Sequence, residues 1–240
     1  MKISSAIFDR SAPDLDSCPD ESLLEFAFIG RSNVGKSSLL NMLAGQGILA
    51  RVSAVPGFTK MINFFTMNKC WRLVDLPGYG FAQVAREDRS QFNQAVADYL
   101  EERVNLCRVF ALIDSGLPPQ KIDLEFVEWL TSNAVPFVLV FTKIDKVAPA
   151  TVQANIQAFT DCISKWFEKM PAIFTCSSVT KYGRSELLGV IEAAMAEAQA
   201  KSGQPPQQAA VNPPEELPPT DRKPMVRGTR GKRPNPARPW

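Results

Sequence analysis

One short segment limits the possible folds of this chain more than any other. Residues 30–37 read G-R-S-N-V-G-K-S and fit the phosphate-loop pattern G-x-x-x-x-G-K-[ST]. An apolar run at 24–29 precedes the segment, and an amphipathic stretch at 36–43 follows it. Glycines at these positions allow backbone N–H groups to turn inward around phosphates, at the positive end of a helix dipole. The segment therefore predicts a strand, a phosphate-binding loop and a helix in succession.

Apolar runs alternate with amphipathic stretches from about residue 24 to residue 198. Several runs are nearly continuous in Val, Ile, Leu and Phe, which is typical of parallel strands covered on both faces. The pattern predicts an α/β fold of the P-loop NTPase class, with a mostly parallel, doubly wound sheet and helices on both faces. The expected strands are 24–29, 62–67, 71–74, 109–113, 137–141 and 173–175, and the expected helices are 36–43, 89–103, 122–132, 151–167 and 185–198.

The chain is expected to have three parts: a lead-in at 1–21 that can add one edge strand, a folded domain at 22–200, and a tail at 201–240. The tail contains ten prolines and few apolar residues. We expect it to be disordered, because it cannot bury enough surface to offset the entropy of ordering. Seven basic residues lie within 222–238, whereas residues 1–220 carry 20 basic and 24 acidic side chains.

Composition argues against several kinds of site. The 240 residues include no histidine, which removes the commonest general base and the commonest transition-metal ligand. The five cysteines form no C-x-x-C pair, which argues against a zinc site and a disulfide framework. No apolar run approaches the roughly 20 residues of a membrane span, and the N-terminus has no signal-peptide pattern. We expect a cytoplasmic protein whose chemistry uses carboxylates, hydroxyls, lysines, backbone amides and a hard cation.

A second motif, D-L-P-G at 75–78, follows the third expected strand. By itself D-x-P-G is an ordinary turn signal, but after a phosphate loop at this spacing it indicates a magnesium and γ-phosphate site. Asp75 is expected to reach Mg²⁺ through water, and the Gly78 N–H to contact a γ-phosphate. In the phosphate loop, Lys36 is expected to reach the β- and γ-phosphates, and the Ser37 hydroxyl to bind Mg²⁺.

Two further segments indicate which base is bound. In T-K-I-D at 142–145, the Asp145 carboxylate presents two acceptors that match the N1–H and amino donors of guanine, a pattern that adenine lacks. The stem of Lys143 can stack over the base. Ser177 and Ser178 follow the last expected strand and can hold the guanine O6, although such a pair is usually a helix cap. The combination predicts GTP rather than ATP, and hence a G domain.

The loop V-P-G-F-T-K at 55–60 contains a threonine between the first expected helix and the next strand. Thr59 could close on Mg²⁺ only when a γ-phosphate is present, which would make the loop an order–disorder switch. A threonine alone in a loop is otherwise simply solvated. With the other motifs present, we expect the switch role.

These motifs together resemble the EngB (YihA/YsxC) family, within the TrmE-Era-EngA-EngB-septin-like P-loop GTPases. The resemblance covers about residues 20–195 and rests on F-x-G-R-S-N-V-G-K-S-S-L in near form, P-G-x-T, D-L-P-G-Y-G-F-A, T-K-x-D-K and S-S-x-T-K-Y-G-R-S-E-L. It implies GTP binding with Mg²⁺, a role in assembly of the large ribosomal subunit, and a link to normal cell division and septation. The chain departs from the family at Phe58 and Lys60, where P-G-R-T-Q is usual, and has a longer tail.

The expected site therefore has three overlapping sets of residues. The catalytic candidates are Lys36, Thr59 and Gly78. The Mg²⁺ candidates are Ser37, Thr59 and, through water, Asp75. The nucleotide-binding candidates are Gly30, Arg31, Ser32, Asn33, Val34, Gly35, Lys36, Ser37, Ser38, Gly57, Phe58, Thr59, Lys60, Met61, Asp75, Leu76, Pro77, Gly78, Thr142, Lys143, Ile144, Asp145, Cys176, Ser177, Ser178 and Val179.

Hydrolysis is expected to be slow. In better-known GTPases a glutamine directly after D-x-x-G orients the attacking water, and here that position is Tyr79, which cannot do the same. We expect turnover to rise when a partner supplies or orders the missing group. A K⁺ ion near the phosphate loop is one candidate, and by analogy with related GTPases Asn33 is its candidate ligand.

The motifs leave the biological role open. The leading hypothesis is a switch that binds a precursor of the large ribosomal subunit, with residues 222–238 as an rRNA tether. The alternative for the tail is a solvated linker with incidental charge. The rivals are a septum-associated GTP-binding interaction module with little hydrolysis and, least favoured, a metabolic kinase. The lack of a coiled-coil pattern weakly indicates a monomer.

Overall fold

The computed structural model describes residues 1–45, 61–79 and 86–202, and for 86–93 it describes the backbone only. The expected site residues Gly57, Phe58, Thr59 and Lys60, and the tail from residue 203, lie outside the described residues. The expectations for the loop switch and for the disorder and rRNA role of the tail are therefore not tested by the structure. None of the helices in the described part combines the length and apolar character needed to cross a bilayer.

The described residues form one seven-stranded sheet in the order β1-β3-β4-β2-β5-β6-β7. The pairs β1–β3 and β3–β4 are antiparallel, and the other four pairs are parallel. The predicted mostly parallel sheet is thus confirmed, and the lead-in supplies its edge strand. The strands are β1 (Ala6–Ala12), β2 (Leu24–Gly30), β3 (Ile62–Met67), β4 (Trp71–Asp75), β5 (Leu106–Asp114), β6 (Phe137–Thr142) and β7 (Ile173–Thr175).

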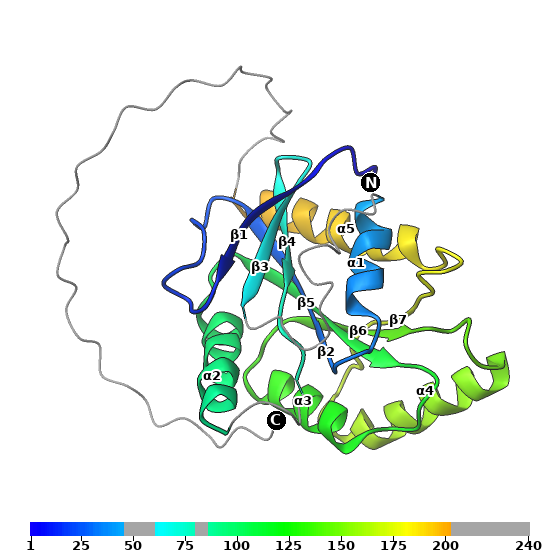
Figure 1. Cartoon of the computed structure of the whole chain (residues 1–240). Coiled ribbons are helices and arrows are strands. Elements are labelled where there is room, and N and C mark those ends of the chain that lie inside the picture. Colours follow the sequence, from blue (N-terminus) through cyan, green and yellow to red (C-terminus); the bar gives the residue numbers. More distant parts are fainter. Residues whose placement is uncertain (46–60, 80–85, 203–240) are drawn as a thin grey trace, which may run out of the picture.

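Helices cover both faces of this sheet, as a doubly wound fold requires (Figure 1). The first and last helices pack against one face, and the three between them pack against the other. The helices are α1 (Lys36–Ala44), α2 (Arg86–Glu102), α3 (Lys121–Ser132), α4 (Pro149–Ile163) with a 3₁₀ turn at Ser164–Trp166, and α5 (Arg184–Ser202).

The central strand β2 shows why the apolar runs are nearly continuous. Successive side chains of a strand point to opposite faces, so Phe26 and Phe28 enter the core beneath α1 and α5, while Ala27 and Ile29 enter the core beneath α2 and α3. All four side chains are buried. A strand buried on both faces favours apolar residues at successive positions, and the sequence shows such a run at 26–29.

The position of β2 also determines where a ligand can bind. Strand β2 lies between β4 and β5, so the chain leaves it for one side of the sheet through α1 and later returns across the other face through α2. Such a topological switch point leaves a crevice outside the carboxyl ends of the strands. The phosphate loop lies at this point, because it follows the last residue of β2.

A buried ion pair closes the opposite, amino end of the parallel strands. Glu25 on β2 is fully buried. It accepts hydrogen bonds from the Tyr99 hydroxyl at 2.9 Å and from Arg103 Nη2 and Nε at 2.7 and 2.9 Å. Because Tyr99 lies in the last turns of α2 and Arg103 directly follows it, these contacts fix the C-terminal end of α2 to the central strand.

Candidate nucleotide-binding site

The phosphate loop forms a tight turn between β2 and α1. A Cβ at Gly30 would lie 2.7 Å from the Leu112 carbonyl oxygen and 2.9 Å from Val34 Cγ1, so no larger residue fits there. Asn33 and Gly35 both have positive φ, 64° and 101°. No side chain caps α1, and its first turn contains no acidic residue. No capping side chain therefore competes for the first N–H groups of α1, which can donate to a bound anion.

Lys36 and Asp75, predicted from separate motifs, are brought together at this turn. The Lys36 ammonium pairs with the Asp75 carboxylate, whose side chain is only 2% exposed. Ser37 follows in the first turn of α1. A hydroxyl and a carboxylate are hard oxygen donors, which suit Mg²⁺. Among the described residues, no group of three or more His, Cys, Asp or Glu is placed so that it could hold a metal ion.

The segment after β4 lies directly against the phosphate loop. The Leu76 N–H donates to the Phe28 carbonyl at 3.0 Å, and Tyr79 forms a parallel bridge with Arg31. A Cβ at Gly78 would lie 2.7 Å from the Gly30 carbonyl oxygen. Only glycine allows this approach, which places the Gly78 backbone beside the loop. Pro77 is buried in the same segment.

Tyr79, at the position of the water-orienting glutamine, is buried and held by α3. Its hydroxyl donates to Asp123 Oδ1 at 2.9 Å, and its ring stacks on Phe126 with centroids 4.5 Å apart. Burial and the neighbouring carboxylate raise the pKa of Tyr79 well above its usual value, so the hydroxyl keeps its proton. The Tyr79 hydroxyl is thus directed to α3.

Asp123 was not among the predicted site residues. It lies in the first turn of α3, where an acidic residue is ordinarily explained by the helix dipole. In the structure it also accepts hydrogen bonds from Arg31 Nε at 2.8 and 2.9 Å. Burial raises the pKa of the Asp123 carboxyl, and the hydrogen bonds from Arg31 oppose that rise. No local sequence signal indicates a partner 92 residues away.

The T-K-I-D segment is tied to the phosphate loop by two side chains. The Thr142 hydroxyl donates to the Val34 carbonyl at 2.6 Å. Lys143 has a φ of 61° and donates to the Asn33 carbonyl at 2.6 Å and to Asp114 Oδ2 at 2.7 Å. Its Cε and Cγ would lie 3.6 and 3.8 Å from a Cβ at position 35. The lysine stem therefore runs alongside the loop that is expected to hold the phosphates.

Asp145 and Ser177 lie together at the end of this segment. A hydrogen bond from the Ser177 side chain is the main cause that lowers the pKa of Asp145, so the carboxylate stays ionised and can accept from guanine. The Cys176 N–H donates to the Phe141 carbonyl at 2.8 Å, which continues the pairing of β6 and β7 up to the serine. Ser178 is half-buried next to it.

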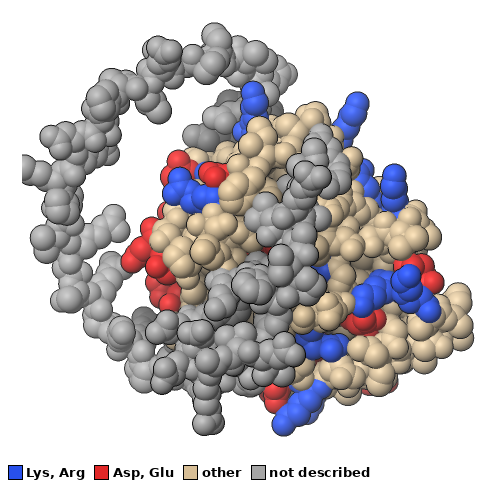
Figure 2. Space-filling view, viewed as in Figure 1, with Lys and Arg blue, Asp and Glu red and all other residues tan. Residues whose placement is uncertain are grey.

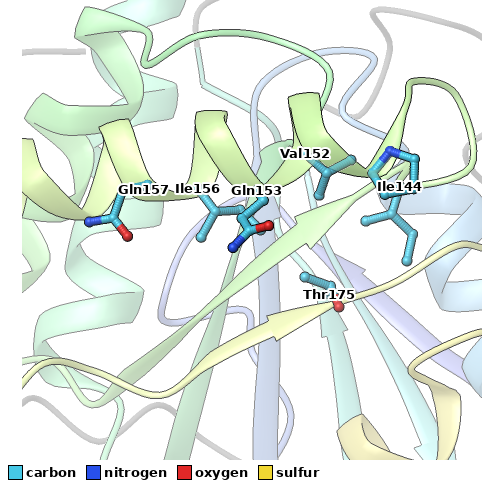
Figure 3. A pocket seen from close by; sticks show the side chains of 7 residues that line it. Ile144, Val152, Gln153, Ile156, Gln157 and Thr175 are labelled. Atoms are coloured by element: carbon cyan, nitrogen blue, oxygen red, sulfur yellow. The ribbon is translucent and has the colours of Figure 1, made fainter.

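The remaining predicted residues are Ile144, beside α4, and five residues with exposed side chains. Ile144 lines a pocket of about 300 Å³ between α4 and β7, together with Val152, Ile156 and Thr175 (Figure 3). The other predicted residues within the described part have exposed side chains: Ser32, Asn33, Ser38, Met61 and Val179.

Comparison with known proteins agrees with this geometry. A family model described as "50S ribosome-binding GTPase" matches residues 25–143. The chain is 47% identical over 201 residues to a probable GTP-binding protein EngB from Bacteroides fragilis, covering 84% of this chain and 100% of the relative. The chain belongs to the EngB family of GTP-binding proteins. An EngB relative from Bacteroides thetaiotaomicron is 48% identical over 192 residues, covering 80% of this chain and 95% of that protein.

Solved structures support the fold of this EngB-family chain. A crystal structure of a probable GTP-binding protein engB aligns with a TM-score of 0.57 at 23% identity, covering 72% of this chain and 99% of the other. At that identity the likeness shows the fold alone. The family membership confirms the resemblance inferred from the motifs, and the structure confirms the predicted G-domain architecture.

Proposed function

We propose that this EngB-family chain is a cytoplasmic, monomeric GTP switch with slow GTPase activity, which uses Mg²⁺ and acts in assembly of the large ribosomal subunit. One observation carries the nucleotide part: the contacts of Thr142 and Lys143 with the phosphate loop. These hydrogen bonds hold the candidate guanine-recognition segment directly against the phosphate loop, so that one nucleotide could contact both.

Guanine selection follows from the chemistry of Asp145. An ionised carboxylate accepts two N–H donors side by side, which guanine offers at N1 and at its amino group. Adenine offers an unprotonated N1 at the same edge, so it would leave the carboxylate opposite a lone pair. A site built around a hydrogen-bonding group rejects such an analogue strongly, because its polar atoms stay unpaired. The structure therefore favours GTP and GDP over ATP.

Ser37, Asp75 through water and, in the GTP state, Thr59 would hold Mg²⁺, which would neutralise charge on the phosphates. The protein's own groups position the nucleotide. Lys36 exchanges its contact with Asp75 for phosphate oxygens, and the N–H groups of α1 and Gly78 donate to the same phosphates. Phosphoryl transfer depends mainly on such positioning.

Slow hydrolysis follows from the position of Tyr79. Its hydroxyl is engaged by Asp123, so no group from this position orients an attacking water. A ribosomal partner, or a K⁺ ion near Asn33, would supply the missing contribution. Turnover measured in KCl and in NaCl tests the role of K⁺. If the rates in the two salts are equal, both with and without ribosomal particles, K⁺ is removed from the proposal.

The ribosomal role rests on the family and on the distribution of charge. On the face shown in Figure 2, Lys and Arg side chains are spread over the domain with Asp and Glu between them. Residues 1–220 carry four more acidic than basic groups, whereas 222–238 hold seven basic ones. Arg and Lys neutralise phosphates, so the tail is the better candidate for contact with rRNA.

Co-sedimentation with ribosomal particles tests the whole proposal. The protein is loaded with GDP or with a non-hydrolysable GTP analogue and is sedimented at two salt concentrations. Binding to the large subunit or its precursor only with the analogue is the expected result. Tight guanine-nucleotide binding without ribosomal binding in either state would favour the septum-associated interaction module instead.

A further inference from the structure

Three segments that are distant in sequence meet at one buried carboxylate. Asp123 on α3 has a side chain that is 1% exposed. It accepts from Arg31 of the phosphate loop and from Tyr79 of the segment after β4. The parallel bridge between Arg31 and Tyr79 places their backbones side by side. Asp123 therefore binds the phosphate loop through Arg31 and the segment after β4 through Tyr79, at the point where the two lie side by side.

The charge of Asp123 gives this connection its strength. A buried carboxylate is costly unless it is paired and hydrogen-bonded, and removing one partner leaves the remaining charge uncompensated. Here Arg31 supplies the opposite charge and Tyr79 a second donor. Both residues are consequently held to α3 by the same group, and neither can move away without leaving the carboxylate undersatisfied.

The connection bears directly on Gly78. This glycine immediately precedes Tyr79, and its Cα approaches the Gly30 carbonyl and the Ser32 N–H so closely that a Cβ would lie 2.7 and 3.4 Å from those atoms. The position of the Gly78 N–H relative to the loop therefore depends on how Tyr79 is anchored. GDP has no γ-phosphate, so only GTP uses this N–H.

We propose that Asp123 is a positioning residue of the site, which holds Arg31 and Tyr79 in register so that the Gly78 N–H is set for a γ-phosphate. It thereby determines how strongly the protein prefers GTP to GDP. This inference rests on the GTP binding proposed above.

The docking of α3 does not itself need Asp123. The helix buries Phe126, Val127 and Leu130 in the core beneath the sheet, each at most 1% exposed. Those apolar contacts remain when the carboxylate is replaced. The substitution therefore removes only the interactions of Asp123 with Arg31 and Tyr79. A role in positioning can thus be separated from a role in folding.

The test compares affinities for GDP and for a non-hydrolysable GTP analogue, measured by titration with Mg²⁺ on the full chain. Asp123→Asn keeps the size of the side chain but removes its charge. Tyr79→Phe removes only the hydroxyl and keeps the ring on Phe126. Glu128→Gln removes an exposed charge from the same helix and is the matched control.

For Asp123→Asn, we expect the analogue affinity to fall about tenfold more than the GDP affinity, because hydrogen bonds to a charged group are lost. Tyr79→Phe should shift the ratio in the same direction by a smaller factor, and Glu128→Gln should leave it unchanged. Equal losses for both nucleotides, or an unchanged ratio in both variants, would overturn the inference.

Two further outcomes are kept distinct. If Asp123→Asn does not fold, Tyr79→Phe decides alone, and an unchanged ratio in it overturns the inference. If the unaltered chain binds neither nucleotide, the proposed function fails and the inference falls with it. Binding of both nucleotides by the unaltered chain, with equal losses in the variants, rejects the inference alone.

Discussion

At the scale of single residues, the site depends on glycines that leave room for neighbouring backbone. Replacing Gly30 with alanine would place a methyl group 2.7 Å from the Leu112 carbonyl oxygen. We expect Gly30→Ala to lower the free energy of unfolding by about 1–3 kcal/mol, since the core has to shift, and to weaken nucleotide binding. Denaturant unfolding and a GDP titration measure the two effects.

Gly189 in α5 supplies the matched control. A Cβ there meets nothing within 4 Å among the described residues. Alanine is preferred to glycine inside a helix by roughly 0.5–1 kcal/mol, so Gly189→Ala should raise the free energy of unfolding by about that amount and leave nucleotide affinity unchanged. Equal destabilisation by the two substitutions would contradict the steric argument.

The base contact makes a second prediction at this scale. Asp145→Asn replaces one of two acceptors with a donor that faces a guanine N–H. We expect affinity for GDP to fall by about 10²-fold or more, because polar groups at the base are left unpaired. Xanthine carries a carbonyl where guanine has its amino group, so affinity for xanthosine diphosphate should rise.

Asp161→Asn on the exposed face of α4 makes the same chemical change away from the site, where the Asp161 carboxylate accepts a hydrogen bond from Gln157 one turn earlier. Its affinities for both nucleotides should match those of the unaltered chain. Titration of the two diphosphates against both variants checks the prediction. A parallel loss of both nucleotides in Asp145→Asn would point to misfolding of the segment instead.

At the scale of elements, most strands and helices could be predicted because they are buried in a regular pattern. The prediction errors lie where a helix-start signal in the sequence was overlooked or where a contact forms only in the folded chain. Helix α4 was expected at 151–167, but it begins at Pro149, a residue favoured in the first helical turn, and ends at Ile163 in a 3₁₀ turn. The contact of Asp123 with Arg31 could not be predicted, since only the folded sheet brings α3 to the phosphate loop.

The anchoring of α2 gives the element-scale prediction. Glu25→Gln would leave the buried Arg103 with only the exposed Glu21, 3.6 Å away, as a counter-charge. We expect a loss of about 3 kcal/mol in the free energy of unfolding, because the buried partner of the pair is removed. Nucleotide affinity of the folded variant should be unchanged, because this ion pair closes the amino end of the strands and the site lies at the carboxyl end. Denaturant unfolding and GDP titration of one sample give both values.

Glu192→Gln is the control for that substitution. Glu192 is 63% exposed and pairs with the N-terminal amine of Met1 at 3.0 Å. Exposed ion pairs contribute about 0–1 kcal/mol, so the variant should be nearly as stable as the unaltered chain. A comparable loss in both variants would show that burial of the Glu25 pair is not what matters.

At the scale of the whole molecule, the chain combines a mildly acidic body with a basic tail. Ending the chain after Ser202 keeps α5 complete and removes all seven basic residues of 222–238. If the tail binds rRNA, the logarithm of affinity for ribosomal particles should fall less steeply with the logarithm of salt, the slope changing by up to about 5 for seven lost phosphate contacts on single strands.

A second form of the chain separates charge from length. Replacing the seven basic residues with glutamine retains the prolines and the reach of the tail, so it should reproduce the weaker salt dependence of the truncated chain. Nucleotide affinity should be the same in all three forms, because the described site uses no residue beyond 202. If truncation changes neither the affinity for particles nor its salt slope, the tail is a solvated linker, and the contact with rRNA has to be sought on the domain itself.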